Sequence, residues 1–470
     1  MKTVFGLAIL LALFFLIGCK KDSFITSPDA QVTITADTLK YDTVFTTAGS
    51  ITQSFKIINE NSRKLKLSSV KLMGGNSSPF KINVDGFTEP EVTNLEIAAN
   101  DSIYVFVSVI VNQNANALPF IIRDSIHINY NGKDRWVQLE AWGQNAHFFR
   151  NKKITVNETW LNDLPYVILG SLIIDTNKIL TIDKGCRIYI HADAPVLVDG
   201  SLQVNGQKDT LDRVYFRGDR LDEPYKDFPA SWPGIFFRGN SKDNILNYAV
   251  LKNAYQALAL TDPSPNANPK LILNECIIDN AYDAGIIALN SSIRGRNCLV
   301  SNCGKNLYLL KGGDYQFIHC TVASYSNSFI SHKDPVLLVS NYINVNNVPV
   351  IAGLTAFFTN CIFWGENGLV DDEVVVARAG STGVFNVSFN NNLWKVQNNP
   401  STIPGVTAAQ IINNQPPLFD SINVFNRYYD FHLQAASPAI NKGTNAGVLI
   451  DLDGNSRPVG LPDLGCFEKR

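Results

Sequence analysis

Short apolar runs, separated by turn residues, recur along the second half of the chain at a nearly constant spacing. Residues 246–258 read LNYAVLKNAYQAL and residues 273–285 read LNECIIDNAYDAG, so the same order of apolar and polar positions returns after 27 residues. A short β-segment that repeats every 20–30 residues or so is typical of a β-solenoid, in which each repeat forms one coil stacked on the last. We therefore predict that the two stretches are successive coils.

A small apolar residue marks the same place in each repeat. It is a cysteine in NECIIDN, RNCLVSN, IHCTVAS and TNCIFWG, at intervals of 22, 22 and 41 residues, and we interpret the last interval as nearly two periods. A metal or redox role is the alternative, but each cysteine lies in an apolar run and none forms a paired C-x-x-C zinc pattern. We predict an interior ladder of small hydrophobic side chains at Ala249, Cys276, Cys298, Cys320 and Cys361.

Asparagine follows the ladder position by four residues in three repeats, at Asn253, Asn280 and Asn302. Stacked asparagine side chains hydrogen-bond along a turn and satisfy backbone groups that a bent strand leaves open. This pattern resembles the asparagine ladder of right-handed parallel β-helices of the pectate-lyase type. Upstream, LTIDKGCRIYIH and LVDGSLQVNG resemble the opening coils of bacterial β-helix lipoproteins. We expect the β-helix to span residues 150–415.

The chain on either side of the repeats has a different pattern. Residues 31–146 contain alternating runs spaced for a β-sandwich of about seven strands, and SFKIINENSRKLKLSSV resembles the immunoglobulin-like modules of extracytoplasmic proteins. DFHLQAASPAINKG and DLDGNSRPVGLPDLGCFE, within residues 416–470, resemble the terminal segment of pectin-lyase-fold surface proteins, including those with a choice-of-anchor domain. An open solenoid end exposes a strand edge, so we expect this segment to cap it. The predicted fold class is all-β, with an immunoglobulin-like β-sandwich, a right-handed parallel β-helix (pectin-lyase-like) and a C-terminal cap.

The first residues have the layout of an export signal. Residues 1–18 combine Lys2 with a short apolar run that is too short to span a bilayer as a stable helix. The segment LIGC resembles a bacterial lipobox, which implies a lipid on Cys19 and attachment to a membrane, with residues 19–30 as the lipidated N-terminus and linker. An ordinary signal peptide that contains a cysteine is the alternative. Lysine rather than aspartate follows Cys19, which favours the outer membrane, and we expect exposure at the cell surface.

The triplet of Asp, then Ser or Thr, then an aliphatic residue recurs along the chain. It resembles the O-glycosylation signal that Bacteroidetes-type bacteria use on exported proteins, and ordinary strand alternation is the alternative. Its occurrences include Asp37-Thr38-Leu39, Asp42-Thr43-Val44, Asp101-Ser102-Ile103, Asp124-Ser125-Ile126, Asp209-Thr210-Leu211 and Asp420-Ser421-Ile422.

Charge and cysteine content narrow the possible partners. The chain has 40 Lys and Arg against 42 Asp and Glu, interspersed, which is not the footprint of a nucleic-acid-binding protein. Seven cysteines remain after Cys19, and an odd number argues against a complete disulfide framework. The histidines show no metal-ligand spacing. We expect no cofactor, with calcium relevant only if the chain were a lyase.

Catalysis on this fold would require particular groups. A lyase needs a Lys or Arg base near acidic groups, often with calcium, and a hydrolase needs two or three carboxylates that neighbouring coils bring together. Acidic residues do not repeat in register after the ladder position. The residues that come nearest to either arrangement are Asp279, Asp283, Asp371, Asp372 and Arg378.

Residues 217–239, RGDRLDEPYKDFPASWPGIFFRG, interrupt the coil rhythm with charges, prolines and aromatic residues. Insertions between coils usually carry binding surface, and aromatic rings supply contact area at low entropic cost. We predict a binding role for Arg220, Tyr225, Phe228 and Trp232, with inward packing of Trp232 as an equal alternative. The predicted function is non-catalytic presentation of a surface that binds a glycan or an outer-membrane or surface protein. The alternatives are a polysaccharide lyase or hydrolase acting on an acidic polysaccharide, and a structural subunit of an outer-membrane assembly.

Overall fold

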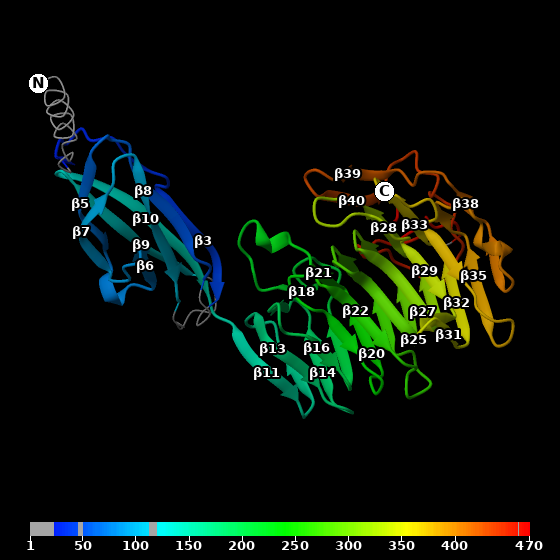
Figure 1. Ribbon diagram of the computed structural model, residues 1–470. Helices are drawn as coiled ribbons and strands as arrows, with labels where there is room; N and C mark the ends of the chain where they lie inside the picture. The colour runs from blue at the N-terminus through cyan, green and yellow to red at the C-terminus, as the bar shows by residue number, and fades with distance from the viewer. Residues whose placement is uncertain (1–22, 46–49, 112–119, 459) are drawn as a thin grey trace, which may run out of the picture. The chain divides into compact units, whose positions relative to one another are not determined.

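The computed structural model describes residues 23–45, 50–111, 120–458 and 460–470. They form two compact units, one ending at Asn145 and the other running from Ala146 to Arg470. Both units consist of β-strands with a few short 3-10 turns, and the described residues contain no α-helix (Figure 1). The all-β prediction is confirmed. Within the same described ranges, no helix has the length and apolar character that a membrane crossing requires.

The first unit packs two sheets against one hydrophobic core. One sheet has the order β1-β5-β9-β10-β3 with β7 also paired to β5, and the other has the order β2-β4-β8-β6. The alternation expected of a half-buried strand is clear in β10, where Val137, Leu139 and Ala141 are buried. The strands are β1 (Phe24–Ile25), β2 (Val32–Ile34), β3 (Thr38–Phe45), β4 (Gln53–Asn59), β5 (Lys64–Leu72), β6 (Phe80–Val84), β7 (Glu91–Ile97), β8 (Asp101–Val109), β9 (Phe120–Tyr130) and β10 (Lys133–Gln144).

This unit has more strands than the pattern predicts. The described residues form ten strands, where the alternating runs indicate about seven. Strands without a sequence signal include β1, which is two residues long, and β7, whose sequence EVTNLEI alternates poorly. Both pair with β5, so they are set by that neighbour rather than by their own periodicity.

The second unit is a parallel β-helix. Its large sheet contains only parallel pairings, and each strand pairs with a strand one coil later. Val250 of β21 lies opposite Ile277 of β24, and Ile277 lies opposite Leu299 of β26. The two stretches that resemble each other are therefore successive coils, as predicted.

The second unit contains, in chain order, the strands β11 (His147–Ile154), β12 (Glu158–Trp160), β13 (Tyr166–Ile174), β14 (Ile179–Asp183), β15 (Arg187–Ile190), β16 (Val196–Val198), β17 (Ser201–Asn205), β18 (Val214–Gly218), β19 (Ile235–Phe237), β20 (Asn244–Asn247), β21 (Ala249–Lys252), β22 (Gln256–Thr261), β23 (Leu271–Asn274), β24 (Ile277–Asp279), β25 (Ala284–Arg296), β26 (Leu299–Ser301), β27 (Lys305–Ile318), β28 (Thr321–Tyr325), β29 (Leu337–Ser340), β30 (Tyr342–Val345), β31 (Val348–Ile351), β32 (Leu354–Thr359), β33 (Ile362–Glu366), β34 (Val374–Ala377), β35 (Phe385–Asn390), β36 (Leu393–Trp394), β37 (Val406–Ala409), β38 (Ile412–Asn413), β39 (Phe419–Asn423) and β40 (Tyr428–Leu433).

The 41-residue interval between Cys320 and Cys361 is one coil, and its interpretation as nearly two periods is wrong. Thr321 of β28 lies directly opposite Ile362 of β33, so no coil intervenes. The extra length goes into a loop over residues 326–336 and into the antiparallel hairpin β30–β31. Residue spacing alone cannot separate an inserted loop from an additional coil, because both add a similar number of residues.

The small residues marking each repeat occupy the interior. Ala249, Cys276, Cys298, Cys320 and Cys361 are each at most 1% exposed and belong to the core of the coils. Burial raises the pKa of the thiols of Cys276, Cys298 and Cys320, so these groups stay protonated and unreactive.

Residues 416–470 lie along the side of the coils, whereas the sequence predicts a cap on the open end. Phe431 and Phe467 pack with Leu299, Ile362 and Leu393, which are outward-facing residues of successive coils. These coil residues would otherwise leave an apolar stripe in water, and the segment removes that stripe from solvent. We refer to residues 416–470 as the flank segment.

Candidate functional site

The repeated turn of the β-helix has a backbone conformation that favours asparagine. Asn253, Asn280 and Asn302 have φ values of 64°, 59° and 52°. Most side chains are strained in this left-handed region, whereas asparagine is tolerated because its short amide can hydrogen-bond locally. Successive turns also join through their backbones, since Asn253 N donates to Asp279 O at 3.2 Å and Asn280 N donates to Ser301 O at 3.1 Å.

The asparagine side chains connect the turns to the insertion at residues 217–239. Asn280 Nδ2 donates to Asn253 Oδ1 at 2.8 Å and to the Asp227 carbonyl at 3.0 Å. Asn253 Nδ2 donates to the Lys226 carbonyl at 2.8 Å. The insertion is therefore bound to two successive turns through the carbonyl groups of Lys226 and Asp227.

A polar pocket of about 120 Å³ lies over these turns. Four separate stretches of chain line it: the insertion, the stacked turns, the loop over residues 326–336 and the β39–β40 hairpin of the flank segment. We call it the ladder pocket, and its lining residues are Asp227, Lys252, Asn253, Asp279, Asn280, Asn302, Asn327, Asn426, Arg427 and Tyr429.

The charges of the ladder pocket are balanced in pairs. Lys252 Nζ lies 3.3 Å from Asp279 Oδ2, and Arg427 Nη2 lies 3.5 Å from Asp227 Oδ2. The Ser301 hydroxyl also donates to Asp279 Oδ1 at 2.8 Å. The pocket therefore offers donors and acceptors to a polar ligand without a strong field of either sign.

Two exposed tyrosines stand on the same turns. Tyr255 and Tyr282 are 46% and 52% exposed, and their rings stack with centroids 5.9 Å apart. They occupy the same place in NAYQ and NAYD, so the coil repeat itself aligns them. These residues are absent from the sequence-based site, although their repetition in a polar turn is a signal that could have identified them.

Asp283 follows Tyr282 and is engaged by its neighbours. It accepts hydrogen bonds from Gln256 Nε2 at 2.6 Å and Lys305 Nζ at 2.7 Å. Burial raises the pKa of Asp283, but these two hydrogen bonds outweigh it and lower the pKa below its ordinary value. Asp283 is therefore ionised near neutral pH and is a poor general acid.

The residues predicted in the insertion separate into surface and core. Arg220 lies 4.0 Å from the ring centroid of Tyr225, and Tyr225 contacts Phe228 with centroids 5.2 Å apart. Phe228 in turn contacts Phe329 of the neighbouring loop at 4.8 Å. The pocket-lining Arg427 lies 4.6 Å from the ring centroid of Phe329, so these contacts form an aromatic wall beside the ladder pocket.

Trp232 does not belong to that surface. It is 0% exposed, and its Nε1 donates to the Lys252 carbonyl at 2.8 Å. The ring fills the interior beneath the turn that carries Lys252 and Asn253, which excludes direct contact with a ligand. The inward-packing alternative therefore describes this residue.

The five candidate catalytic residues do not meet in one place, and only Asp279 lines the ladder pocket. Asp371 is an exposed residue, while Asp372 accepts hydrogen bonds from the Gln397 and Asn398 backbone amides at 2.7 and 2.8 Å. Arg378 donates to the Pro404 carbonyl at 2.7 Å. Asp372 and Arg378 thus fix local loops. Across the described residues, no group of three or more His, Cys, Asp and Glu side chains is placed to hold a metal ion.

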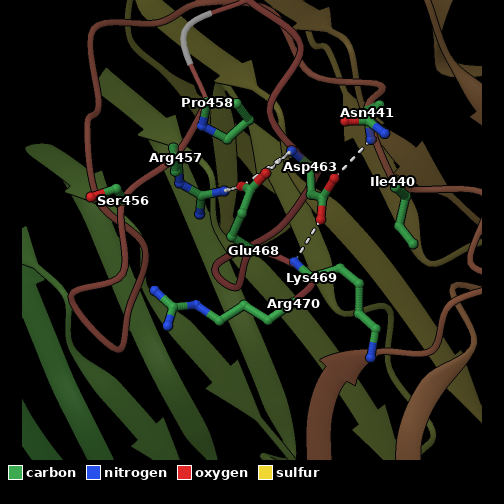
Figure 2. A pocket seen from close by; sticks show the side chains of 9 residues that line it. All are labelled: Ile440, Asn441, Ser456, Arg457, Pro458, Asp463, Glu468, Lys469 and Arg470. Carbon is green, nitrogen blue, oxygen red and sulfur yellow. Dashed lines mark hydrogen bonds and ion pairs between the residues drawn. The ribbon is translucent and has the colours of Figure 1, made fainter.

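A larger pocket, of about 420 Å³, lies within the flank segment (Figure 2). Its charged groups bind one another: Arg457 Nη1 lies 2.7 Å from Glu468 Oε2, and Asp463 accepts from the backbone amides of Asn441 and Lys469. Arg457 Nη2 also donates to Asn297 Oδ1 of a coil at 3.0 Å. This cluster holds the flank segment on the β-helix, and we assign it a structural role.

The comparisons with known proteins give no family. No family model matches the chain, and no curated protein matches it. Among solved structures, the chain is similar to pectate lyase Pel9A, with 14% identity and a TM-score of 0.23 over 63% of this chain and 89% of that one. It is also similar to a family 123 glycoside hydrolase from Clostridium perfringens, with 13% identity and a TM-score of 0.19 over 26% of this chain and 30% of that one.

A third similar structure is the CooA pilin subunit from enterotoxigenic Escherichia coli, with 10% identity and a TM-score of 0.19 over 24% of this chain and 97% of that one. Of the glycoside hydrolase named above, this chain covers less than a third of the length. At TM-scores this low, none of these likenesses supports an argument about fold or function. The fold rests instead on the parallel register of the coils.

The β39–β40 hairpin, which carries Asn426 and Arg427, is tied to the rest of the flank segment by His432. His432 Nε2 lies 2.9 Å from Asp453 Oδ2, and Nδ1 lies 2.5 Å from Asp430 Oδ1. The hydrogen bond to Asp453, aided by Asp430 and opposed by burial, raises the pKa of His432 from 6.5 to about 9. Since the folded pKa exceeds the unfolded one, this contribution to stability is complete below about pH 6.5 and is lost as the pH rises through about 9.

We expect the β39–β40 hairpin to loosen between about pH 7 and pH 9.5 in the native protein, and not in a His432→Gln variant. Amide hydrogen exchange in β39 and β40, corrected for the intrinsic rate at each pH, measures this. A His191→Gln variant is the matched control, because His191 pairs with Asp219 outside the hairpin. Equal pH dependence in the native and His432→Gln proteins would show that this histidine does not hold the hairpin.

Proposed function

We propose that the chain is an exported, lipid-anchored protein whose β-helix binds a glycan at the ladder pocket without turning it over. The observation that carries this proposal is the stacked, exposed pair Tyr255 and Tyr282, each two residues after an asparagine that lines a pocket with balanced charges. Sugar rings present an apolar face edged by hydroxyl groups. Aromatic rings next to fixed donors and acceptors suit both parts of such a ligand.

The spacing of the coils supports an extended ligand rather than a single sugar. Equivalent residues in successive coils are separated by about 4.8 Å, the distance between hydrogen-bonded strands. Tyr255 and Tyr282 are equivalent in this sense, and their centroids lie 5.9 Å apart. A glycan chain running along the coils would meet a ring and a set of polar groups at each step.

The charge pairing favours binding over catalysis. Asp279 and Asp227 each face a cation, and the pKa of Asp283 is lowered, whereas a glycosidase acid needs a raised pKa. A polysaccharide lyase or hydrolase is the second candidate, because Lys252 and Arg427 share the pocket with the two carboxylates. A structural role in an outer-membrane assembly is the third.

The cellular location of the protein and the immunoglobulin-like character of its first unit are proposals that rest on the sequence. Cys19 lies outside the described residues, and the lipid on it, the outer-membrane address and the surface exposure rest on the LIGC motif. We also propose that the two-sheet unit is an immunoglobulin-like module. The Asp-Ser/Thr-aliphatic triplets are proposed glycosylation sites; Thr210 and the following Leu211 are exposed and accessible to such a modification.

The binding proposal is tested with the mature chain on an array of bacterial, plant and animal oligosaccharides. Removing both rings in a Tyr255→Ala/Tyr282→Ala variant should weaken binding at least about fivefold, since each aromatic contact contributes about 0.5–1.5 kcal/mol. The matched control is Tyr104→Ala/Phe106→Ala, which removes a second exposed, stacked ring pair in the first unit. Unchanged binding by the Tyr255→Ala/Tyr282→Ala variant would remove the ladder pocket as the site.

Turnover is measured on the same glycans by ultraviolet absorbance of unsaturated products and by release of reducing ends. We expect neither from the native chain. Turnover that disappears in an Asp279→Asn variant would make the chain an enzyme and would favour the second candidate.

A further inference from the structure

The first unit exposes two tryptophans on one face of one strand. In β10, Trp136 and Trp142 are 46% and 44% exposed, whereas the intervening Val137, Leu139 and Ala141 are buried. Side chains two residues apart along a strand point to the same face, so the two rings lie on the outer face of this sheet. Tryptophan is highly buried on average in folded proteins, and two of them this exposed on one strand call for an explanation.

The face between the rings is polar, and the pairing of β10 with β3 shifts register between Ala141 and Trp142. The pairing of β10 with β9 runs without a shift in register from Lys133 to Gly143. Gln138 and Glu140 stand between the tryptophans, and Glu140 accepts a hydrogen bond from Arg123 Nε of β9 at 2.9 Å. Trp136 and Trp142 are six positions apart on an extended strand, which places their rings about 20 Å apart. The hydrogen-bonding side chains of Gln138 and Glu140 lie between them.

Trp136 is held in position by its neighbour across the strands. His127 lies opposite Trp136 in β9, with ring centroids 4.5 Å apart, and His127 Nε2 lies 2.7 Å from Asp134 Oδ1. At the other end, Trp142 lies opposite the exposed Ile121. Each tryptophan therefore lies beside a side chain of β9: His127 next to Trp136, and Ile121 next to Trp142. A ring that is already ordered loses little conformational entropy when a ligand binds to it.

The chemistry of the face argues against a protein or membrane partner. Charged residues are depleted from the centre of protein interfaces, yet Arg123 and Glu140 occupy the centre of this one. Lys71 and Glu91 form a further ion pair in the same sheet, with nitrogen and oxygen 2.9 Å apart. A membrane surface would be met by a continuous apolar or basic face, and this face has mixed charge.

We propose that the outer face of the sheet β1-β5-β9-β10-β3 is a second glycan-binding surface, on which Trp136 and Trp142 stack against two sugars of one oligosaccharide. Gln138, Glu140 and Arg123 hydrogen-bond the sugars between them. This surface belongs to the first unit and does not depend on the ladder pocket of the β-helix.

The test is made in the Tyr255→Ala/Tyr282→Ala background, so that the ladder pocket does not contribute. This protein and its Trp136→Ala/Trp142→Ala derivative are compared on an oligosaccharide array. Hydroxyethylcellulose and polygalacturonate in native gels serve as a neutral and an acidic probe. We expect binding by the parent, dependence on chain length, and at least about a fivefold loss in the Trp136→Ala/Trp142→Ala derivative. Tyr104→Ala/Phe106→Ala, on the other sheet, is the matched control and should bind normally.

Two outcomes overturn the proposal. One is a parent and derivative with the same pattern on the array, including no binding by either. The other is a loss of binding in the Tyr104→Ala/Phe106→Ala control as large as that in the tryptophan variants. Neither outcome bears on the ladder pocket, which is tested by its own tyrosine variant in an otherwise native chain.

Discussion

Replacing Trp232 by alanine is expected to lower the free energy of unfolding of the β-helix unit by about 3–5 kcal/mol. The indole is 0% exposed and fills the interior beneath the repeated turn. Its removal leaves a cavity that the stacked coils cannot close by moving inward. It also leaves the Lys252 carbonyl without the indole N–H that it accepts at 2.8 Å. Guanidinium denaturation followed by circular dichroism measures the change.

Two variants separate packing from surface effects. Trp232→Phe keeps most of the apolar volume and loses the hydrogen bond, so we expect a smaller loss of about 1–2 kcal/mol. Tyr225→Ala, in the same insertion, removes a ring that is 42% exposed and should change stability by no more than about 0.5 kcal/mol. If Trp232→Ala were as stable as the native chain, the buried position of the indole would be contradicted.

The repeat of the coils was predictable because equivalent positions in successive coils of a β-helix need the same kinds of residue, so the sequence repeats with the period of the coil. A small apolar residue returns at one interior position of successive coils, and asparagine returns in three of them at the left-handed turn four residues later. The covering of the coils by the flank segment was also signalled. Runs such as CLVS and CIFW are apolar at consecutive positions, which indicates strands buried on both faces. The 41-residue coil was misread because loop insertions leave no trace in the period.

The ladder pocket was predictable only in part. Asp279 lies in the repeated turn and could be identified from it, and Tyr282 could have been found by the same comparison. Arg427 meets Asp227 across 200 residues of sequence, and that contact depends on how the flank segment folds back along the coils. No local pattern records such a contact. Trp232 shows the converse limit, because an aromatic residue in a charged insertion has the same sequence signal whether it faces inward or outward.

A second large loss of stability is expected at His332 and Glu373, a buried hydrogen-bonded pair that joins the loop over residues 326–336 to the start of β34. His332 Nε2 lies 2.8 Å from Glu373 Oε1, and the two side chains are 1% and 0% exposed. Glu373 Oε2 also accepts from the Val336 amide at 3.3 Å, while Lys395 Nζ reaches Oε1 only at 4.0 Å. Removing either partner leaves the other buried without its main hydrogen bond. We therefore expect His332→Leu and Glu373→Met each to cost about 3–5 kcal/mol.

The double variant His332→Leu/Glu373→Met should cost far less than the sum of the single variants, because it replaces the pair by apolar groups and leaves neither side chain buried without its partner. A double-mutant cycle by guanidinium denaturation measures this coupling, and Glu373→Gln, which can still accept from the ring, is the mild control. Additive losses would show that the two residues act independently. His332 also lies in the loop that carries Asn327 and Phe329, and its amide donates to the Ser326 hydroxyl at 2.9 Å. The single variants should therefore weaken glycan binding at the ladder pocket as well, since they loosen the wall that Phe329 shares with Phe228.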